Sequence, residues 1–287
     1  MEQLADKVYV ETEYAGINVG ALITKKGIVC IDIPSYPRDA RHWVDQLHML
    51  DPRPIRYIII TNCHGDRLLN ARWLNAPLIT HQTTADRLIG YDKRYPQPLL
   101  DSLIARNPDA GRDLSNSPVE RASLSFTEDM SLFYHDHEVK LRYLPGPECG
   151  SVCVHLVDAG ILFTGDLLTV DTCPMLAQSD IDAWLQSLEF LCQPEYNAPV
   201  IVPSRGPITE ASSLTVLAEF IHDVRAYVRQ FQQQNRPRSE LNAYVGEIMY
   251  DLPAGYLPRE WIQAQLRAGL EYIYDQMKTK ARPEQPG

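Results

Sequence analysis

The sequence predicts an α/β protein with a helical C-terminal segment. Short runs rich in Val, Ile and Thr fill most of the chain before Thr209, and such runs are typical of strands. Segments with helical periodicity lie between some of them, and after Thr209 only helical periodicity remains. Because strands and helices alternate without a change in composition, we expect one α/β domain (1–210) with a helical segment (211–287) packed on it.

The expected strands are apolar runs bounded by Gly, Pro or Asp. In chain order they are 16–24, 27–33, 56–61, 76–81, 139–144, 151–157, 160–166 and 199–204. The expected helices carry an apolar residue at every third or fourth position, which gives each helix one apolar side. They are 40–50, 179–192, 214–233, 240–250 and 259–278.

The composition indicates an acidic globular protein with a sizeable core. Hydrophobic residues make up 45% of the chain, and the formal net charge is −10. No basic run is present, so we expect no nucleic-acid partner, because such binding needs clustered Lys and Arg. The start does not resemble a signal peptide and no apolar run is long enough to span a membrane, so we expect a cytoplasmic protein without a membrane partner. The six scattered cysteines are expected to be reduced.

The most informative stretch is an expected strand that runs into a polar cluster, Ile-Ile-Ile-Thr-Asn-Cys-His-Gly-Asp-Arg (58–67). Leu-Pro-Gly-Pro-Glu-Cys-Gly (144–150), Phe-Thr-Gly-Asp (163–166) and Val-Pro-Ser-Arg-Gly (202–206) follow in that order. Together these segments resemble the metallo-β-lactamase superfamily, whose landmarks are Thr-His-x-His-x-Asp-His, Gly-His-Thr, Thr-Gly-Asp and a last loop with His. The resemblance covers roughly residues 8–210 and implies a four-layer αββα sandwich of two mixed sheets with helices outside.

The metal-ligand positions of that family are poorly kept in this sequence. Three of the seven positions still hold a metal-binding residue, namely His64, Asp66 and Asp166. The other four, which are His in the family, hold Asn62, Arg67, Pro147 and Arg205. By the resemblance, the first metal site keeps only His64 and the second only Asp66, with Asp166 between them. Zn²⁺ normally takes at least three protein ligands, so neither site is complete.

The two arginines suggest a different use of the site. Arg stays protonated in proteins and offers only hydrogen-bond donors, so it cannot bind a cation. Arg67 and Arg205 replace the two histidines of the second metal site, and with Asp66 and Asp166 they can form a neutral cluster of paired charges. We therefore predict a metal-free pocket without a cofactor. If zinc or another divalent metal binds, the expected ligands are His64, Asp66 and Asp166.

Several site residues keep a functional alternative. In an active site, Asp66 would be the catalytic general base that orients the attacking water; otherwise it pairs with an arginine of the site. His64 would be a metal ligand, or a polar residue that hydrogen-bonds Asp166 or a backbone group. Asp32 matches a family aspartate beneath the metal site and is expected to orient the site residues without touching a metal.

A rebuilt metal site is a further alternative. Glu148 and Cys149 lie in the second landmark, and together with His64 and Asp166 they offer acceptable ligand chemistry for one metal. A nucleophilic Cys–His pair is also open. The sequence His-Asp-His-Glu (135–138) looks like a metal cluster, but we expect it to be a solvated hairpin turn.

These observations leave more than one function open. The expected function is that of a metallo-β-lactamase-like protein that lacks the usual hydrolase activity and binds a small anionic molecule. The alternative is a hydrolase of an ester, thioester or lactam, which would require one bound metal. The helical segment could also dimerise the chain or cap the pocket, so a homodimer is a possible assembly. The expected pocket residues are Asn62, His64, Asp66, Arg67, Pro147, Glu148, Cys149, Asp166 and Arg205.

Overall fold

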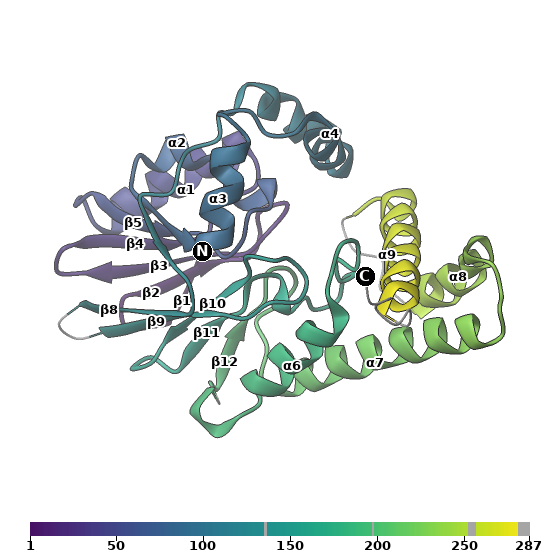
Figure 1. Cartoon of the computed structure of the whole chain (residues 1–287). Helices are drawn as coiled ribbons and strands as arrows, with labels where there is room; N and C mark the ends of the chain where they lie inside the picture. The colour runs from purple at the N-terminus through teal and green to yellow at the C-terminus, as the bar shows by residue number, and fades with distance from the viewer. Residues whose placement is uncertain (135–136, 197, 252–256, 281–287) are drawn as a thin grey trace, which may run out of the picture.

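Two β-sheets lie face to face in the computed structural model, and helices cover their outer faces (Figure 1). The structure describes residues 1–134, 137–196, 198–251 and 257–280. The arrangement is the predicted αββα sandwich of four layers, with further helices at the C-terminal end. Within these ranges, no helix has both the length and the apolar character that crossing a bilayer requires.

The first sheet contains seven strands in the described part of the chain, and they lie in sequence order. Strands β1 to β4 are antiparallel, whereas β4 to β7 run parallel to one another. Parallel neighbours need a long crossover connection, which explains the segments with helices between these later strands. The strands are β1 (Glu2–Ala5), β2 (Val8–Glu11), β3 (Val19–Thr24), β4 (Gly27–Ile31), β5 (Ile55–Ile59), β6 (Leu78–His81) and β7 (Leu124–Phe126).

The second sheet has the strand order β12-β11-β10-β9-β8. Its strands are antiparallel except for β11 and β12, which are parallel. The strands are β8 (Asp129–Tyr134), β9 (His137–Tyr143), β10 (Val152–Leu156), β11 (Ile161–Phe163) and β12 (Val200–Val202). Because Tyr134 pairs with His137, the expected turn over 135–138 is corrected at one end: His137 and Glu138 belong to β9. Residues 135 and 136 lie outside the described residues.

The helices divide between the two outer faces and the C-terminal end (Figure 1). They are α1 (Pro37–Leu50), α2 (Ala71–Leu74), α3 (Gln82–Gly90), α4 (Gln97–Arg106), α5 (Pro108–Gly111), α6 (Ile181–Leu191), α7 (Ser212–Gln233), α8 (Asn242–Asp251) and α9 (Arg259–Lys280). Short 3-10 helices are Gly65–Arg67, Arg112–Asn116, Gly165–Leu167, Pro194–Tyr196 and Arg238–Leu241. The predicted strands and helices are present near their expected bounds.

Strand β4 shows why the central strands are apolar on both faces. Val29 and Ile31 point into the core between the two sheets. Ile28 and Cys30 point the other way, into the core that includes Trp43 of α1. Side chains alternate along a strand, and both faces of this strand are covered, so its sequence carries no polar alternation.

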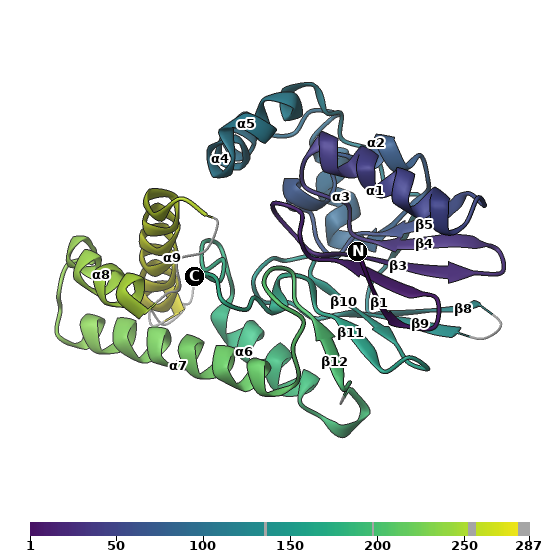
Figure 2. The same cartoon turned by 180° about the vertical axis from the view of Figure 1, so that it is seen from behind.

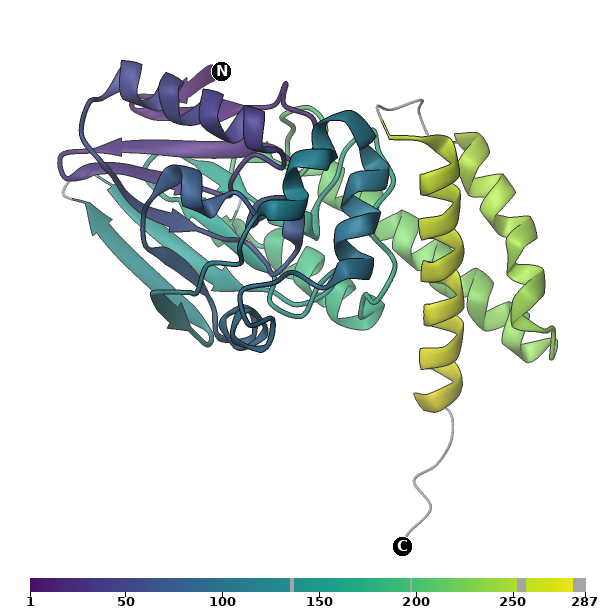
Figure 3. The same cartoon turned by 90° about the horizontal axis from the view of Figure 1, so that it is seen from above.

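Helices α7, α8 and α9 lie to one side of the sandwich (Figures 2 and 3). One apolar core joins them to the second sheet and α6, with Trp184 from α6, Val224 from α7 and Leu266 from α9. The predicted helical segment is therefore present and packs on the second sheet's side. The division of the chain into 1–210 and 211–287 stays a prediction.

Candidate functional site

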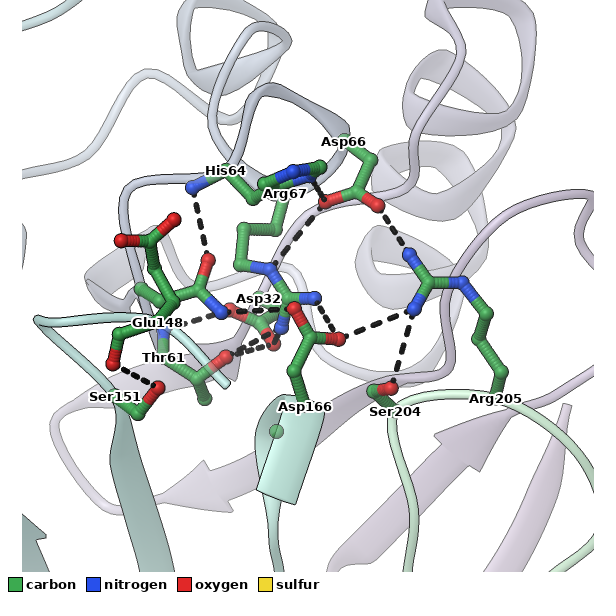
Figure 4. Close-up of polar contacts among 12 residues, drawn as sticks. Asp32, Thr61, His64, Asp66, Arg67, Glu148, Ser151, Asp166, Ser204 and Arg205 are labelled. Atoms are coloured by element: carbon green, nitrogen blue, oxygen red, sulfur yellow. Dashed lines mark hydrogen bonds and ion pairs between the residues drawn. The ribbon is translucent and has the colours of Figure 1, made fainter. Parts of the chain in front are cut away.

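Four loops meet at one end of the two sheets (Figure 4). They are residues 60–67, 144–151, 164–167 and 203–206. Backbone hydrogen bonds hold these loops and their flanking residues together. Val152 N donates to Thr61 O over 2.8 Å, and Val170 N donates to Arg205 O over 3.0 Å. Polar residues that are far apart in the sequence are thereby brought into one cluster.

Asp166 lies at the centre of this cluster. Arg67 Nη2 donates to its Oδ1 over 2.6 Å, and Arg205 Nη1 donates to the same oxygen over 3.1 Å. Asn62 Nδ2 donates to the other oxygen, Oδ2, over 2.9 Å. These contacts place two guanidinium groups on one carboxylate oxygen, in a residue whose side chain is only 5% exposed.

The short turn after β11 aims Asp166 at this position. Gly165 has a φ of +54°, a left-handed conformation that glycine adopts without strain. A Cβ atom built on Gly165 would lie only 2.8 Å from Thr61 Oγ1, closer than real contacts allow. Glycine therefore lets the turn approach the β5 loop closely enough for Asp166 to meet Arg67.

Asp66 forms the second centre of the cluster. Arg205 Nη2 and Arg106 Nη1 both donate to its Oδ2, the latter over 2.7 Å. Its other oxygen, Oδ1, lies 3.4 Å from Arg67 Nε and 3.4 Å from His64 Nδ1. These two distances suit ion pairing but are too long for good hydrogen bonds. The His64 ring thus lies beside Asp66 rather than hydrogen-bonding Asp166.

Asp32 supports the cluster from below, as the sequence predicts. Its Oδ1 accepts from Thr61 N over 2.8 Å, and its Oδ2 accepts from Thr61 Oγ1 over 2.7 Å and from Arg67 Nη1 over 3.1 Å. Asp32 has a φ of +57°, which is uncommon for a residue with a Cβ atom. The hydrogen bonds to Thr61 and Arg67 stabilise this strained conformation and orient the Arg67 guanidinium.

The charges of the cluster shift the acidities of its carboxyl groups. Burial by itself would raise the pKa of Asp66, but His64, Arg205 and Arg67 hold that pKa well below its usual range. The pKa of Asp166 is lowered in the same way, because Arg67 and Arg205 outweigh its burial. Burial dominates at Asp32 and raises its pKa to about 6 despite Arg67.

A cavity of about 250 Å³ opens beside the cluster, slightly smaller than typical small-molecule sites. Its polar wall includes His64, Arg87, Arg106 and Glu148. Its apolar wall includes Leu103 of α4 and Ala268 of α9. The cavity therefore has polar side chains next to the arginine–aspartate cluster and apolar side chains from the helices.

The model of the metallo-beta-lactamase superfamily matches residues 36–205, which include the first three loops of the cluster and residues 203–205 of the fourth. The chain belongs to this superfamily. Solved metallo-β-lactamase-fold structures are similar to it at low sequence identity. A metallo-beta-lactamase from Pontibacter korlensis is 21% identical with a TM-score of 0.60, and the match covers 77% of this chain and 97% of that chain.

Two other solved structures match nearly the whole chain. A metallo-beta-lactamase family protein from Thermus thermophilus is 16% identical with a TM-score of 0.67, covering 96% of this chain and 95% of that chain. A stereoselective inverting sec-alkylsulfatase from a Pseudomonas species is 14% identical with a TM-score of 0.73, covering 96% of this chain and 49% of that chain. Because each match covers 96% of this chain, each includes most of the helical segment formed by α7, α8 and α9.

The side chains at the superfamily's ligand positions do not fit a metal ion. Asp66 and Asp166 point their oxygens at guanidinium groups, which offer donors and positive charge where a cation would need lone pairs. Pro147 lines the cavity, and its side chain has no atom that could bind a metal. Among the described residues, no group of three or more His, Cys, Asp or Glu side chains is arranged to hold a metal.

The rebuilt metal site considered from the sequence is not assembled either. Glu148 Oε1 accepts from Arg87 Nη1 and from Cys149 N, each over 2.9 Å. Asp166 faces two arginines, and His64 faces Asp66. Among the described residues, the four side chains of this alternative therefore form no group that could hold a metal. The role of Asp66 as a general base stays a prediction, and its lowered pKa would make it a weak base.

Arg106 is the member of the cluster that the sequence did not indicate. It is the last residue of α4, 6% exposed, and its guanidinium stacks over the Trp261 ring of α9 at 4.6 Å. An Arg in the last turn of a helix is usually explained by the helix dipole. The one available signal was the apolar spacing of Leu100 and Leu103, which is compatible with a helix but does not indicate where the Arg106 side chain would point.

Proposed function

We propose that this member of the superfamily is a metal-free protein that binds a small anionic molecule and lacks the metal-assisted hydrolysis of its relatives. The observation that carries the proposal is the pair of guanidinium groups on Asp166 Oδ1. That oxygen belongs to the residue that, by resemblance, would bridge two metals. Here, two arginines neutralise it instead.

The energetics of burial support this substitution. An unpaired carboxylate in a protein interior is strongly unfavourable, so loss of the metals would leave Asp66 and Asp166 destabilising unless other cations replaced them. Arg67 and Arg205 are 0% and 2% exposed, and both donate to these carboxylates. Arg is suited to this task because its planar group makes several charge-assisted hydrogen bonds at once.

The side chains that line the cavity are a second argument for an anionic ligand. Arg106, whose Nη1 donates to Asp66, is one of the residues that line it. Arg87 also lines the cavity and is 39% exposed, so it is accessible to a ligand. A carboxylate or phosphate would accept from such donors, while Leu103 and Ala268 would contact an apolar part of the same molecule. The proposed ligand class is a small acid with a short hydrocarbon portion.

The first test is elemental analysis of the protein, purified without an affinity tag, before and after incubation with Zn²⁺, Mn²⁺ and Fe²⁺. We expect less than about 0.1 equivalent of each metal after desalting, because a zinc site needs at least three ligands. Binding of about one equivalent that is lost in His64→Ala would overturn the metal-free proposal and favour the single-metal hydrolase.

A gain-of-metal variant is the matched control. Asn62→His, Arg67→His, Pro147→His and Arg205→His together restore the superfamily's ligand set on the same backbone. We expect this variant, once its fold is verified by circular dichroism, to bind about one to two equivalents of zinc. If it binds zinc and the natural chain does not, the replaced side chains account for the difference.

The ligand is tested separately by thermal shift and calorimetry with small carboxylates, inorganic phosphate and sulfate. We expect at least one carboxylate at millimolar concentration to raise the melting temperature by about 2–4 °C, as mass action predicts for saturation. Arg106→Gln should abolish that shift, whereas Arg112→Gln, which changes a side chain 77% exposed, should keep it. An unchanged melting temperature with every acid would contradict the anionic-ligand proposal.

A further inference from the structure

A second cavity, of about 480 Å³, lies at the N-terminal end of α4. Its volume is within the usual range for small-molecule sites. The lining side chains include two cations, Lys93 and Arg94, and two hydroxyls, Ser115 and Ser117. Among the described residues that line it, none is Asp or Glu. The second cavity therefore offers positive charge and hydrogen-bond donors without a carboxylate to neutralise them.

The backbone holds the two segments of this cavity together. Val119 N donates to Lys93 O over 3.1 Å, which ties the turn before α4 to the segment 115–118. In that turn, Asp92 and Lys93 have φ values of +42° and +70°, which are uncommon for residues with a Cβ atom. The fold thus fixes the position of the cationic turn opposite the serines, although the two segments are separate in the sequence.

The two cations are not used in ion pairs. Lys93 and Arg94 are exposed, and neither pairs with a carboxylate of the part of the chain that the structure describes. Other surface arginines do pair, for example Arg142 with Asp129. The chain as a whole carries a formal charge of −10, so two adjacent cations without a carboxylate partner are available to an external anion.

Ser117 provides an independent indication of a ligand. It lines the second cavity and is only 8% exposed. Its Oγ is buried and has no hydrogen-bond partner among the described residues. Buried hydroxyl groups in proteins normally have a partner, and an unpaired one is unfavourable. An acceptor oxygen in the cavity would supply the missing partner.

Helix α4 adds a favourable dipole. It is ten residues long and begins at Gln97, which also lines the second cavity. The residue before it, Pro96, provides no side-chain cap. The N-terminal end of a helix carries partial positive charge and therefore attracts anions.

We propose that the second cavity binds a phosphate group, either as inorganic phosphate or as part of a small phosphomonoester. Lys93 and Arg94 pair with its negative charge, and Ser115 and Ser117 donate to its oxygens. A phosphate matches these donors better than a carboxylate does, because it has more acceptor oxygens and a larger charge. The inference does not depend on the function proposed for the first cavity, which lies beside the arginine–aspartate cluster.

The two cavities are neighbours, so the test must distinguish them. Tyr95 lines both, and its hydroxyl accepts from Gly65 N over 2.8 Å, next to Asp66. Arg106 lines only the first cavity, whereas Arg94 lines only the second. Substitutions of these two arginines therefore report on different sites.

The test is calorimetric titration of the full chain with inorganic phosphate and with glucose 6-phosphate, and glucose is the neutral control. We expect saturable binding of at least one phosphate compound and no binding of glucose. Equal affinities would identify the free ion as a sufficient ligand, and tighter binding of the ester would identify contacts to its organic part. If neither phosphate compound binds, the proposal is overturned.

Arg94→Gln should weaken phosphate binding at least about tenfold, because a charge-assisted contact is lost. Arg112→Gln is the matched control. It removes the same charge from a side chain that is 77% exposed and does not line the second cavity, so the affinity should change less than about twofold. Equal weakening by both variants would indicate a general charge effect and contradict a built site.

Two further variants locate the ligand. Ser117→Ala should weaken binding about three- to tenfold without lowering the melting temperature of the ligand-free protein, because it removes an unpaired hydroxyl. A lower melting temperature with unchanged affinity would contradict this contact. Arg106→Gln, once its fold is verified by circular dichroism, should keep the phosphate affinity. Loss in Arg106→Gln with retention in Arg94→Gln would place phosphate in the first cavity and overturn this inference, without contradicting the anionic ligand proposed there.

Discussion

At the scale of single residues, the site rests on opposite charges that are buried together. The carboxylates are Asp32, Asp66 and Asp166, and the guanidiniums that contact them are Arg67, Arg106 and Arg205. Each charge has lost its water and is stabilised by its partners instead. Removing one member leaves an uncompensated charge, so these residues depend on one another much more than surface ion pairs do.

Arg67→Met is expected to lower the free energy of unfolding by about 3–5 kcal/mol, because it leaves three buried carboxylates (Asp32, Asp66 and Asp166) short of a partner. Arg142→Met is the matched control, since Arg142 pairs with Asp129 at the surface with both side chains at least 37% exposed. That change should cost less than about 1 kcal/mol. Urea unfolding measures both, and equal losses would contradict the central role of Arg67.

The stability should also depend on pH in a particular way. Asp66 and Asp166 have folded pKa values below their unfolded values, so their contribution is full above about pH 4 and is lost as the pH falls further. Asp32, with a pKa raised to about 6, acts in the opposite direction and adds stability as the pH falls from 6 to 4. Urea midpoints from pH 7 to 3 should rise slightly and then drop below about pH 4. A steady rise down to pH 3 would contradict this assignment.

The identities of the replaced ligands could be predicted from the sequence because each follows a strand in a fixed order. The resemblance to the superfamily implies that the loops after β5, β11 and β12 meet at one end of the sheets, and therefore that Arg67, Asp166 and Arg205 are neighbours. Which atom meets which could not be predicted, because a guanidinium can adopt many rotamers and the packing selects one. The sequence thus predicted the pairing of Asp66 and Asp166 with these arginines but not the contact of Arg67 with Asp32.

At the scale of elements, α4 and α9 together form one side of the site. Trp261 on α9 stacks under the Arg106 guanidinium, and its Nε1 donates to Ser102 Oγ of α4 over 3.4 Å. Helix α4 was not predicted, since its stretch carries no landmark of the superfamily and is flanked by prolines that favour loops. Because this helix was not predicted, Arg106 was not predicted as a residue of the site either.

Trp261→Ala should loosen the contact between these two helices. The stack and the Ser102 hydrogen bond are both lost, so backbone amides of α4 should exchange with deuterium at least about tenfold faster. Tyr250→Ala is the control, because Tyr250 lies on α8 and is 87% exposed. Hydrogen exchange followed by mass spectrometry distinguishes the two, and unchanged protection of α4 in Trp261→Ala would argue against the coupling.

At the scale of the whole molecule, the C-terminal helices complete a core that the sandwich begins. Leu214 and Val224 of α7 are 0% exposed and pack in the same apolar core as Trp184 and Leu188 of α6. This continuity was predictable in outline, because α7 has one apolar side that needs a partner. The identity of that partner depends on the tertiary fold.

A chain that ends at Thr209 should therefore be poorly folded. It would expose the apolar side of α6, and we expect aggregation or strong binding of a hydrophobic dye. Light scattering and dye fluorescence, compared with the full chain, measure this. A soluble, monomeric product with native circular dichroism would show instead that the helical segment is an independent unit, as an interaction module would be.

The network around Asp166 also restricts the evolutionary routes open to this chain. A resident metal depends on supply and can be removed by a chelator, whereas guanidinium groups are present whenever the chain is folded. A single Arg67→His or Arg205→His change would remove a positive charge without completing a metal site, so it would lower stability and return no activity. A complete zinc site at this position would therefore require several substitutions at once. Under the proposed metal-free function, each single change from arginine to histidine is expected to lower stability without providing a metal site.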